Sequence, residues 1–212
     1  MTRIFVFGDS IAYGYYDIEG GWTERLKKFF IEKVISDENY DYSVYNMSIS
    51  GDCTRDVLER FEFEMKQRTK DEEGEIIIFA IGANDTQILN KNEKTIVSPV
   101  ELENNIKKLI FLSRKFSNKI LFVGLTPVDD ERMTPVPWRT DISYNNKYIE
   151  SYNEIIKNTC KENKVPFIDF FKSWFKSNYK DLLEDGAHPN TEGHKKIFET
   201  IKDYLEENNF TI

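Results

Sequence analysis

The sequence predicts an α/β protein in which a parallel sheet is covered by helices on both faces. Short β-branched or aromatic runs alternate with longer segments of helical spacing, which is typical of right-handed βαβ units. The first run, residues 4–7, is continuously apolar, as expected of a strand buried on both faces. No internal repeat, low-complexity tract or linker interrupts the 212 residues, so we expect one domain over residues 1–212.

Four further strands are expected from short apolar runs that follow the first one. They comprise residues 43–47, 76–81, 120–125 and 167–168. Because helical segments separate them, consecutive strands are expected to run parallel.

Five helices are expected, because the remaining segments place apolar residues at the i, i+3, i+4 and i+7 positions of one face. These stripes are Trp22, Leu26, Phe29, Phe30 and Val34; Val57, Leu58, Phe61 and Met65; Leu102, Ile106, Leu109 and Ile110; Tyr148, Tyr152, Ile155, Ile156 and Thr159; and Ile197, Ile201, Tyr204 and Leu205. Each stripe would pack onto the sheet.

The longest irregular stretch is residues 126–142, which holds three of the six prolines along with Met133 and Trp138. A loop of this length in a compact domain is often functional. It follows the C-terminal end of a predicted strand, where open α/β sheets bind their ligands. We therefore expect this loop to contribute to a binding site.

The charge balance excludes several classes of partner. With 37 acidic and 29 basic side chains, the net charge is −8, so the surface should repel nucleic acids and anionic membrane surfaces. A structural zinc site would need all of His188, His194, Cys53 and Cys160. We therefore expect no metal, no nucleic-acid partner and no membrane association.

The cysteines and the start of the chain favour a cytoplasmic location. Cys53 and Cys160 have no motif spacing, which indicates free thiols in a reducing compartment. Residues 1–8 are typical of a strand and lack the pattern of a secretory signal. No stretch approaches the roughly twenty apolar residues of a membrane span.

The first strand leads into Gly8-Asp9-Ser10, where local chemistry alone indicates a strand-to-helix turn capped by Asp9 or Ser10. A phosphoaspartate hydrolase would need Asp-x-Asp here, but Ile11 stands two residues after Asp9. A dinucleotide-binding fold would need G-x-G-x-x-G, which is also absent. What remains is a serine at the C-terminal edge of the sheet, near a helix N-terminus that favours developing negative charge.

A serine becomes a good nucleophile only when a base removes its proton. The bases of suitable pKa are the two histidines, and Asp185 precedes His188 by three residues, close enough for a hydrogen bond on one turn. The same residues also fit a simple turn before the last helix. His194, beside Lys195 and Lys196, is interpreted as a solvated helix residue.

Two further strand ends could supply oxyanion donors. Gly51 follows the second strand, where glycine allows backbone to approach a substrate closely, and the Asn84 amide follows the third. Each is ordinary turn chemistry by itself. A parallel sheet, however, would bring Ser10, Gly51, Asn84 and the Asp185–His188 pair to one edge.

These residues make the sequence resemble the GDSL, or SGNH, hydrolase family. Four ordered blocks carry the resemblance over nearly the whole chain: Gly8-Asp9-Ser10-Ile11, Gly51, Gly82-Ala83-Asn84-Asp85 and Asp185-Gly186-Ala187-His188. Ile11 replaces the family's leucine, a mild variation. The resemblance implies a three-layer α/β/α sandwich on a flavodoxin-like, five-stranded parallel sheet, with no metal or organic cofactor.

The resemblance also implies roles for the site residues. Ser10 would be the nucleophile, His188 the general base and then acid, and Asp185 its orienting partner. The backbone N–H groups of Ser10 and Gly51 and the side-chain amide of Asn84 would form the oxyanion hole. The implied activity is that of a serine esterase acting on a small-molecule ester, with an acyl-enzyme intermediate.

The substrate and the competing functions depend on weaker features. Candidate pocket walls are Tyr13, Tyr15, Tyr16 and residues 126–142, whereas Trp22 is expected to pack under the first helix. A loop rich in proline and charge offers no wide apolar groove, which favours a short acyl or acetyl ester. The alternatives are an acyltransferase with the same nucleophile, a non-catalytic ligand-binding module, and a thiol hydrolase using Cys53.

Overall fold

The computed structural model of the protein describes residues 1–69, 74–208 and 210. Its centre is a five-stranded parallel sheet with the strand order β2-β1-β3-β6-β8. The strands are β1 (Thr2–Gly8), β2 (Tyr42–Asn46), β3 (Gly74–Ala80), β6 (Lys119–Val123) and β8 (Phe167–Ile168). All five predicted strands are present, with ends that differ by one or two residues in most cases.

Strand β1 lies inside the sheet and is buried on both faces. Ile4 and Val6 join the apolar cluster on one face, and Phe5 and Phe7 join the cluster on the other. Side chains alternate between the faces of a strand, so both parities must be apolar when both faces are covered. This double burial explains the uninterrupted apolar run.

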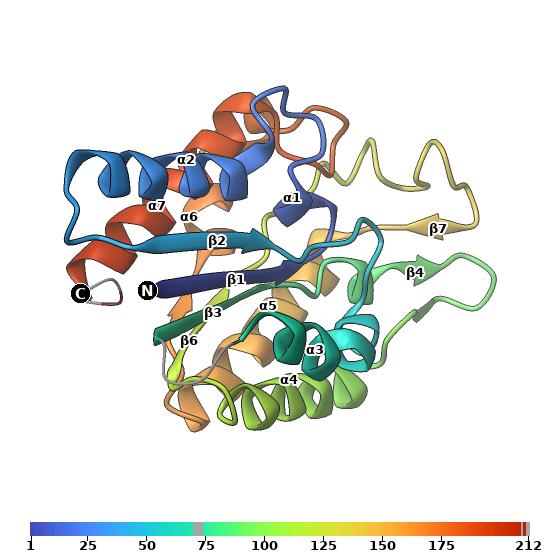
Figure 1. Ribbon diagram of the computed structural model, residues 1–212. Helices are drawn as coiled ribbons and strands as arrows, with labels where there is room; N and C mark the ends of the chain where they lie inside the picture. The colour runs from blue at the N-terminus through green and yellow to red at the C-terminus, as the bar shows by residue number, and fades with distance from the viewer. Residues whose placement is uncertain (70–73, 209, 211–212) are drawn as a thin grey trace.

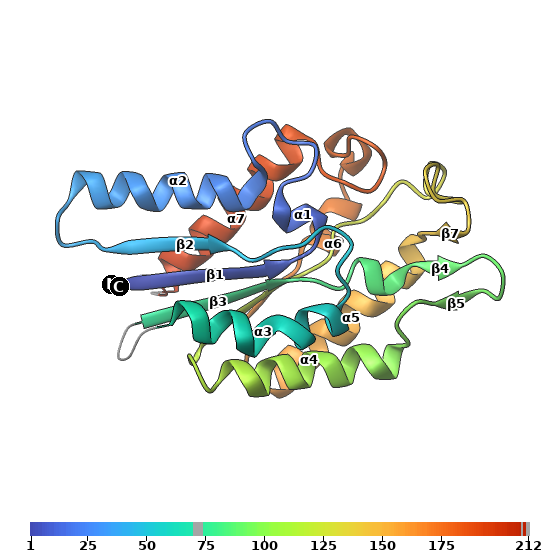
Figure 2. The same ribbon diagram turned by 45° about the vertical axis from the view of Figure 1, so that its right-hand side comes forward.

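Helices cover both faces and form a three-layer α/β/α sandwich (Figures 1 and 2). On one side lie α2 (Gly21–Ser36) and α7 (Thr191–Glu207), and on the other α3 (Thr54–Arg68), α4 (Pro99–Ser113) and α5 (Asn146–Glu162). Shorter helical turns are α1 (Ser10–Tyr13), η1 (Asn84–Thr86), α6 (Phe170–Phe175) and η2 (Tyr179–Leu182). The predicted fold class and the five predicted helices are confirmed.

A second, small antiparallel sheet was not predicted. Its strand order is β5-β4-β7, and the strands are β4 (Ile88–Leu89), β5 (Lys94–Thr95) and β7 (Ile142–Ser143). Strands of two residues have no measurable periodicity, so the sequence does not reveal them. Strand β7 begins at the last residue of the predicted loop 126–142, and the rest of that loop is irregular apart from a bridge between Val136 and Arg139.

His194 is fully buried, so its interpretation as a solvated helix residue is wrong. It lies three residues before Ile197 and seven before Ile201, on the face of α7 that packs against the sheet. The neighbouring lysines, Lys195 and Lys196, are exposed and belong to the opposite face. The helical period therefore decides the position of this side chain, and its charged neighbours do not.

None of the described helices is long and apolar enough to cross a membrane. Across residues 1–69, 74–208 and 210, no three or more His, Cys, Asp or Glu side chains gather as metal ligands. Cys53 and Cys160 are free, as predicted, and the structure buries both of them.

Candidate active site

The predicted site residues meet at one edge of the parallel sheet. Ser10 follows β1, Gly51 follows β2 and Asn84 follows β3, and all three line one cavity of about 590 Å³ together with Asp185 and His188. Strands β1 and β3 are neighbours, and the chain connects β1 to β2 on one side and β3 to β6 on the other. Open α/β sheets bind ligands where the strand connections diverge in this way.

The turn after β1 holds Ser10 at the start of α1. The Asp9 carboxylate caps this short helix by accepting the backbone N–H of Ile11 at 3.0 Å. Gly8 allows the tight approach, because an added Cβ would lie only 2.5 Å from Ala12 Cβ and from the Ala80 carbonyl oxygen. The glycine and the cap together fix the position of the serine.

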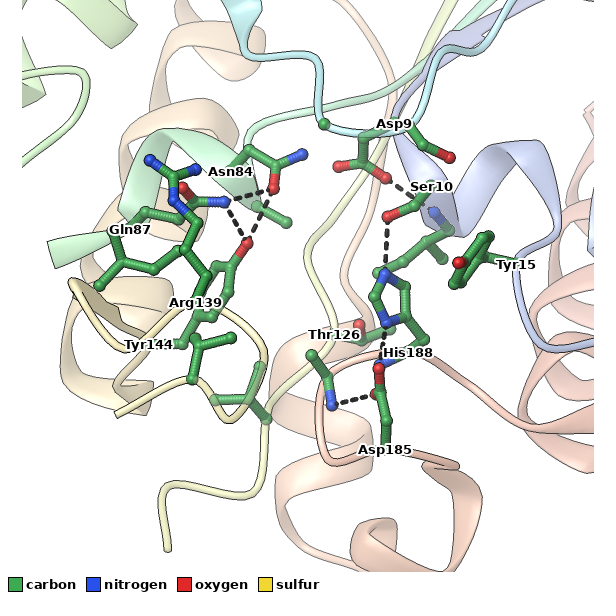
Figure 3. A pocket seen from close by; sticks show the side chains of 18 of the residues that line it. Asp9, Ser10, Tyr15, Asn84, Gln87, Thr126, Arg139, Tyr144, Asp185 and His188 are labelled. Carbon is green, nitrogen blue, oxygen red and sulfur yellow. Dashed lines mark hydrogen bonds and ion pairs between the residues drawn. The ribbon is translucent and has the colours of Figure 1, made fainter. Parts of the chain in front are cut away.

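Ser10, His188 and Asp185 form a continuous chain of hydrogen bonds (Figure 3). Ser10 Oγ lies 2.8 Å from His188 Nε2, and His188 Nδ1 lies 2.7 Å from Asp185 Oδ2. The other carboxylate oxygen of Asp185 accepts the backbone N–H groups of Ala187 and His188 at 2.9 and 2.8 Å. The turn therefore fixes the Asp185 carboxylate through one oxygen and the His188 ring through the other.

The electrostatics of the turn set the proton position on the imidazole. Burial opposes ionisation of Asp185, but hydrogen bonds from the His188 ring and from backbone N–H groups hold its pKa below the usual range. An ionised carboxylate can only accept, so His188 Nδ1 must carry the proton. Nε2 then faces Ser10 Oγ with a free lone pair, which is the arrangement needed to remove the serine proton.

On the other side of the cavity, Asn84 is the first residue of η1. Its Nδ2 donates to the Asp52 carbonyl oxygen at 3.0 Å, and its Oδ1 accepts hydrogen bonds from Gln87 Nε2 at 2.8 Å and Tyr144 Oη at 2.7 Å (Figure 3). The neighbouring Asp85 turns away from the cavity and accepts the Thr54 backbone N–H at 3.0 Å. This bond anchors η1 to the start of α3.

Two backbone N–H groups complete a set of possible oxyanion donors. Gly51 has a φ of +90°, a left-handed conformation that favours glycine. Within the described part of the chain, no hydrogen bond uses the backbone N–H of Ser10 or of Gly51. Both groups, and the second N–H of the Asn84 amide, are therefore available to a ligand in the cavity.

Asp9, in the cavity wall, has a carboxyl group with a strongly raised pKa. Burial raises the pKa of its carboxyl to about 7, even though the hydrogen bond from Ile11 and the nearby His188 act in the opposite direction. Asp9 is therefore partly protonated near neutral pH.

Aromatic side chains surround the imidazole. The ring centroids of Tyr15, Tyr16 and Trp138 lie 5.3, 5.6 and 6.3 Å from that of His188. Tyr15, Tyr16 and Trp138 line the cavity, as predicted. Tyr13, the last residue of α1, does not line the cavity, contrary to the prediction.

Trp22 lies on the buried face of α2 and is packed in the apolar core, as expected. The thiol alternative loses support, because Cys53 does not line the main cavity and burial raises the pKa of its thiol. A thiol with a raised pKa yields little of the nucleophilic thiolate.

The sequence missed two residues of the site, Gln87 and Tyr144. Both contact Asn84, and both lie beside the short strands of the unpredicted sheet. Neither belongs to a recognisable motif.

The chain is similar to known esterases along most of its length. The model of the GDSL-like Lipase/Acylhydrolase family matches residues 6–196. An arylesterase from Vibrio mimicus is 26% identical over 204 residues, covering 96% of this chain and 88% of its own. Esterase TesA from Pseudomonas aeruginosa is 24% identical over 199 residues, covering 93% and 85%. The crystal structure of a lipase/acylhydrolase from Enterococcus faecalis has the same fold, with a TM-score of 0.76, 21% identity and coverage of 98% and 97%.

Proposed function

The chain belongs to the GDSL-like lipase/acylhydrolase family and is an ester-hydrolysing serine hydrolase, and we propose that it cleaves short-chain acyl or acetyl esters with Ser10, His188 and Asp185. The observation that carries the proposal is the unbroken hydrogen-bond chain from Asp185 through His188 to Ser10, at 2.7 and 2.8 Å. This chain of hydrogen bonds ends at Ser10 Oγ, and Ser10 lines the cavity.

The reaction proceeds in two acyl-transfer steps. His188 Nε2 takes the proton of Ser10 Oγ as this oxygen attacks the ester carbonyl, and Asp185 stabilises the imidazolium that forms. His188 then gives the proton to the departing alcohol, leaving an acyl group on Ser10. Water, deprotonated by the same nitrogen, attacks the acyl-enzyme and releases the acid together with free Ser10.

The negative charge of each tetrahedral intermediate needs preorganised donors. The backbone N–H groups of Ser10 and Gly51 and the Nδ2 of Asn84 serve this role in the proposal. They reach the cavity from the ends of three adjacent strands, so the sheet itself sets their spacing.

In this proposal the cavity has an alcohol side and an acyl side. Its volume of about 590 Å³ has to hold both the acyl and the alcohol parts of the substrate. Because His188 protonates the alcohol, this part lies on the imidazole side, against Tyr15, Tyr16 and Trp138. The remaining apolar wall, which includes Val136 and Ile142, is left for the acyl group.

Labelling with a fluorophosphonate tests the nucleophile, because this reagent modifies activated serines. Mass spectrometry should place the adduct on Ser10, and Ser10→Ala and His188→Ala should abolish labelling in folded protein. Ser50→Ala is the matched control, since Ser50 lines the same cavity and should leave labelling unchanged. An adduct elsewhere, or none, would overturn the proposal.

A series of p-nitrophenyl esters tests the acyl preference. We expect kcat/KM to be highest for acetate or butyrate and to fall at least about tenfold for octanoate, since the loop 126–142, rich in proline and charge, offers no wide apolar groove to a longer chain. A maximum at octanoate would contradict the short-chain assignment and leave the nucleophile assignment intact.

A further inference from the structure

The side chain of Asn84 is held at both ends of its amide. Its Oδ1 accepts Tyr144 Oη–H at 2.7 Å and Gln87 Nε2–H at 2.8 Å, while its Nδ2 donates to the Asp52 carbonyl oxygen at 3.0 Å. Gln87 Nε2 also lies 2.6 Å from Tyr144 Oη. The three side chains therefore form a closed triangle of hydrogen bonds on one side of the cavity (Figure 3).

These contacts permit one orientation of the Asn84 amide. A flipped amide would place Oδ1 against the Asp52 carbonyl oxygen, so that two acceptors would face each other. In the observed orientation, Tyr144 donates to Oδ1, and Gln87 uses its two N–H groups for Oδ1 and Tyr144 Oη. Every contact then pairs a donor with an acceptor.

The small sheet places Gln87 and Tyr144 opposite each other. Strands β4 and β7 are antiparallel, and Ile88 pairs with Ser143. Gln87 precedes Ile88 and Tyr144 follows Ser143, so these two residues lie on opposite strands just beyond the last pair of the ladder. The backbone of the small sheet thus places the Gln87 amide and the Tyr144 hydroxyl within hydrogen-bond distance of Asn84 Oδ1.

We propose that Gln87 and Tyr144 are positioning residues that aim the Asn84 amide at the oxyanion. This inference rests on the proposed function of Asn84 as an oxyanion donor. Neither residue needs to touch the reacting atoms, since each acts on the amide oxygen and thereby directs the Nδ2 group at its other end.

Burial makes this orientation effective. Asn84, Gln87 and Tyr144 are each more than nine-tenths buried, so bulk water competes weakly for their hydrogen bonds. Burial also raises the pKa of the Tyr144 hydroxyl, which therefore remains protonated and able to donate. A donor that is already oriented needs no reorganisation when charge develops on the substrate.

The test is steady-state kinetics on Tyr144→Phe, Gln87→Met and the double variant. Tyr144→Phe removes one neutral hydrogen bond from Oδ1, so we expect kcat to fall about 3- to 10-fold while KM changes less than about twofold. The double variant leaves Oδ1 without either donor, and its kcat should fall about 100-fold, towards the 100- to 1,000-fold loss expected for Asn84→Ala.

Ser143→Ala is the matched control. Ser143 precedes Tyr144 in the same small sheet, and its Oγ donates a hydrogen bond to Asn90 Oδ1 at 2.8 Å. Among the described residues, Ser143 makes no hydrogen bond to Asn84. We expect this variant to keep the kcat of the unmodified protein. Equal losses of kcat in Ser143→Ala and Tyr144→Phe would mean that the small sheet acts only as structural support, and would overturn the inference.

A double-mutant cycle separates positioning from a general structural effect. In an Asn84→Ala background, Tyr144→Phe should change kcat less than about twofold, because the amide through which it acts is gone. The same loss of kcat in both backgrounds would overturn the inference and leave the proposed function standing. Full esterase activity in Ser10→Ala would overturn both proposals.

Discussion

His194 Nε2 lies 3.1 Å from the carbonyl oxygen of Tyr15, so the last helix of the chain is bonded to the wall of the cavity. Tyr15 and Tyr16 line that cavity, whereas His194 does not. Burial lowers the pKa of His194, and a carbonyl can only accept, so the neutral ring carries its proton on Nε2. His194 thus holds the backbone of Tyr15, from a position outside the cavity, through this hydrogen bond.

His194→Leu should weaken this support. We expect it to lower the free energy of unfolding by about 1–3 kcal/mol and to raise KM for ester substrates, because the Tyr15 carbonyl loses its donor. His194→Gln keeps an N–H donor at a similar distance from the backbone and should recover most of both losses. Urea unfolding and steady-state kinetics provide the measurements, and equal behaviour of the two variants would rule out the hydrogen bond as the cause.

Asp9 should make stability depend on pH. Its pKa is raised to about 7 in the folded protein from an ordinary value of 3.8, so its contribution to stability is present below pH 4 and is lost as the pH rises through 7. Asp9→Asn retains an oxygen to cap α1 and has no charge to bury.

We therefore expect the free energy of unfolding of Asp9→Asn, relative to the unmodified protein, to increase from pH 5 to pH 8 by at most about 1.4 kcal/mol per pH unit. Denaturant unfolding at several pH values measures this difference. A difference that stays constant would show that Asp9 ionises at its ordinary pKa. Asp181→Asn, at an exposed carboxylate, is the control for loss of one charge.

Asp185→Asn should damage catalysis far more than stability. An asparagine amide can donate to His188 Nδ1, which would favour the tautomer with its proton on Nε2 and remove the base facing Ser10. We expect kcat to fall by about four orders of magnitude. Asp181 lies in the preceding turn, η2, and the control variant Asp181→Asn should keep full activity. A loss of less than tenfold in Asp185→Asn would mean that this carboxylate does not select the tautomer.

Trp138 should contribute to binding rather than to chemistry. Its side chain is 57% exposed and lies beside the imidazole, on the alcohol side of the proposed substrate position. Trp138→Ala should raise KM for aryl esters about 2- to 10-fold and leave kcat nearly unchanged, as expected from the loss of one aromatic contact. Phe111→Ala, at a 67% exposed aromatic residue of α4, should change neither. A fall in kcat alone would assign Trp138 to the reaction itself.

The parallel sheet and the cluster of site residues were predictable because both follow from strong local signals. Uninterrupted apolar runs such as residues 4–7 locate buried strands, and parallel strands end at one edge. Ser10, Gly51 and Asn84 each stand just beyond such an end, so their meeting follows from the topology.

The rest depends on contacts that no local pattern encodes. Gln87 and Tyr144 meet across strands of two residues, from segments separated by 57 positions. His194 follows the helical period, although the adjacent lysines are typical of a solvated face. Tyr13 and Tyr15 are close in sequence, but the end of α1 turns one to solvent and the other to the cavity.

The small sheet also constrains how this enzyme could be redesigned. Strands β4 and β5 lie in the connection between β3 and α4, whereas β7 lies in the connection between β6 and α5, so neither segment belongs to the parallel sheet. Each could be exchanged for a loop of another length without changing a strand of the core. The two must nevertheless be exchanged as a pair, because a transplanted loop that lacked its ladder partner would separate Gln87 from Tyr144.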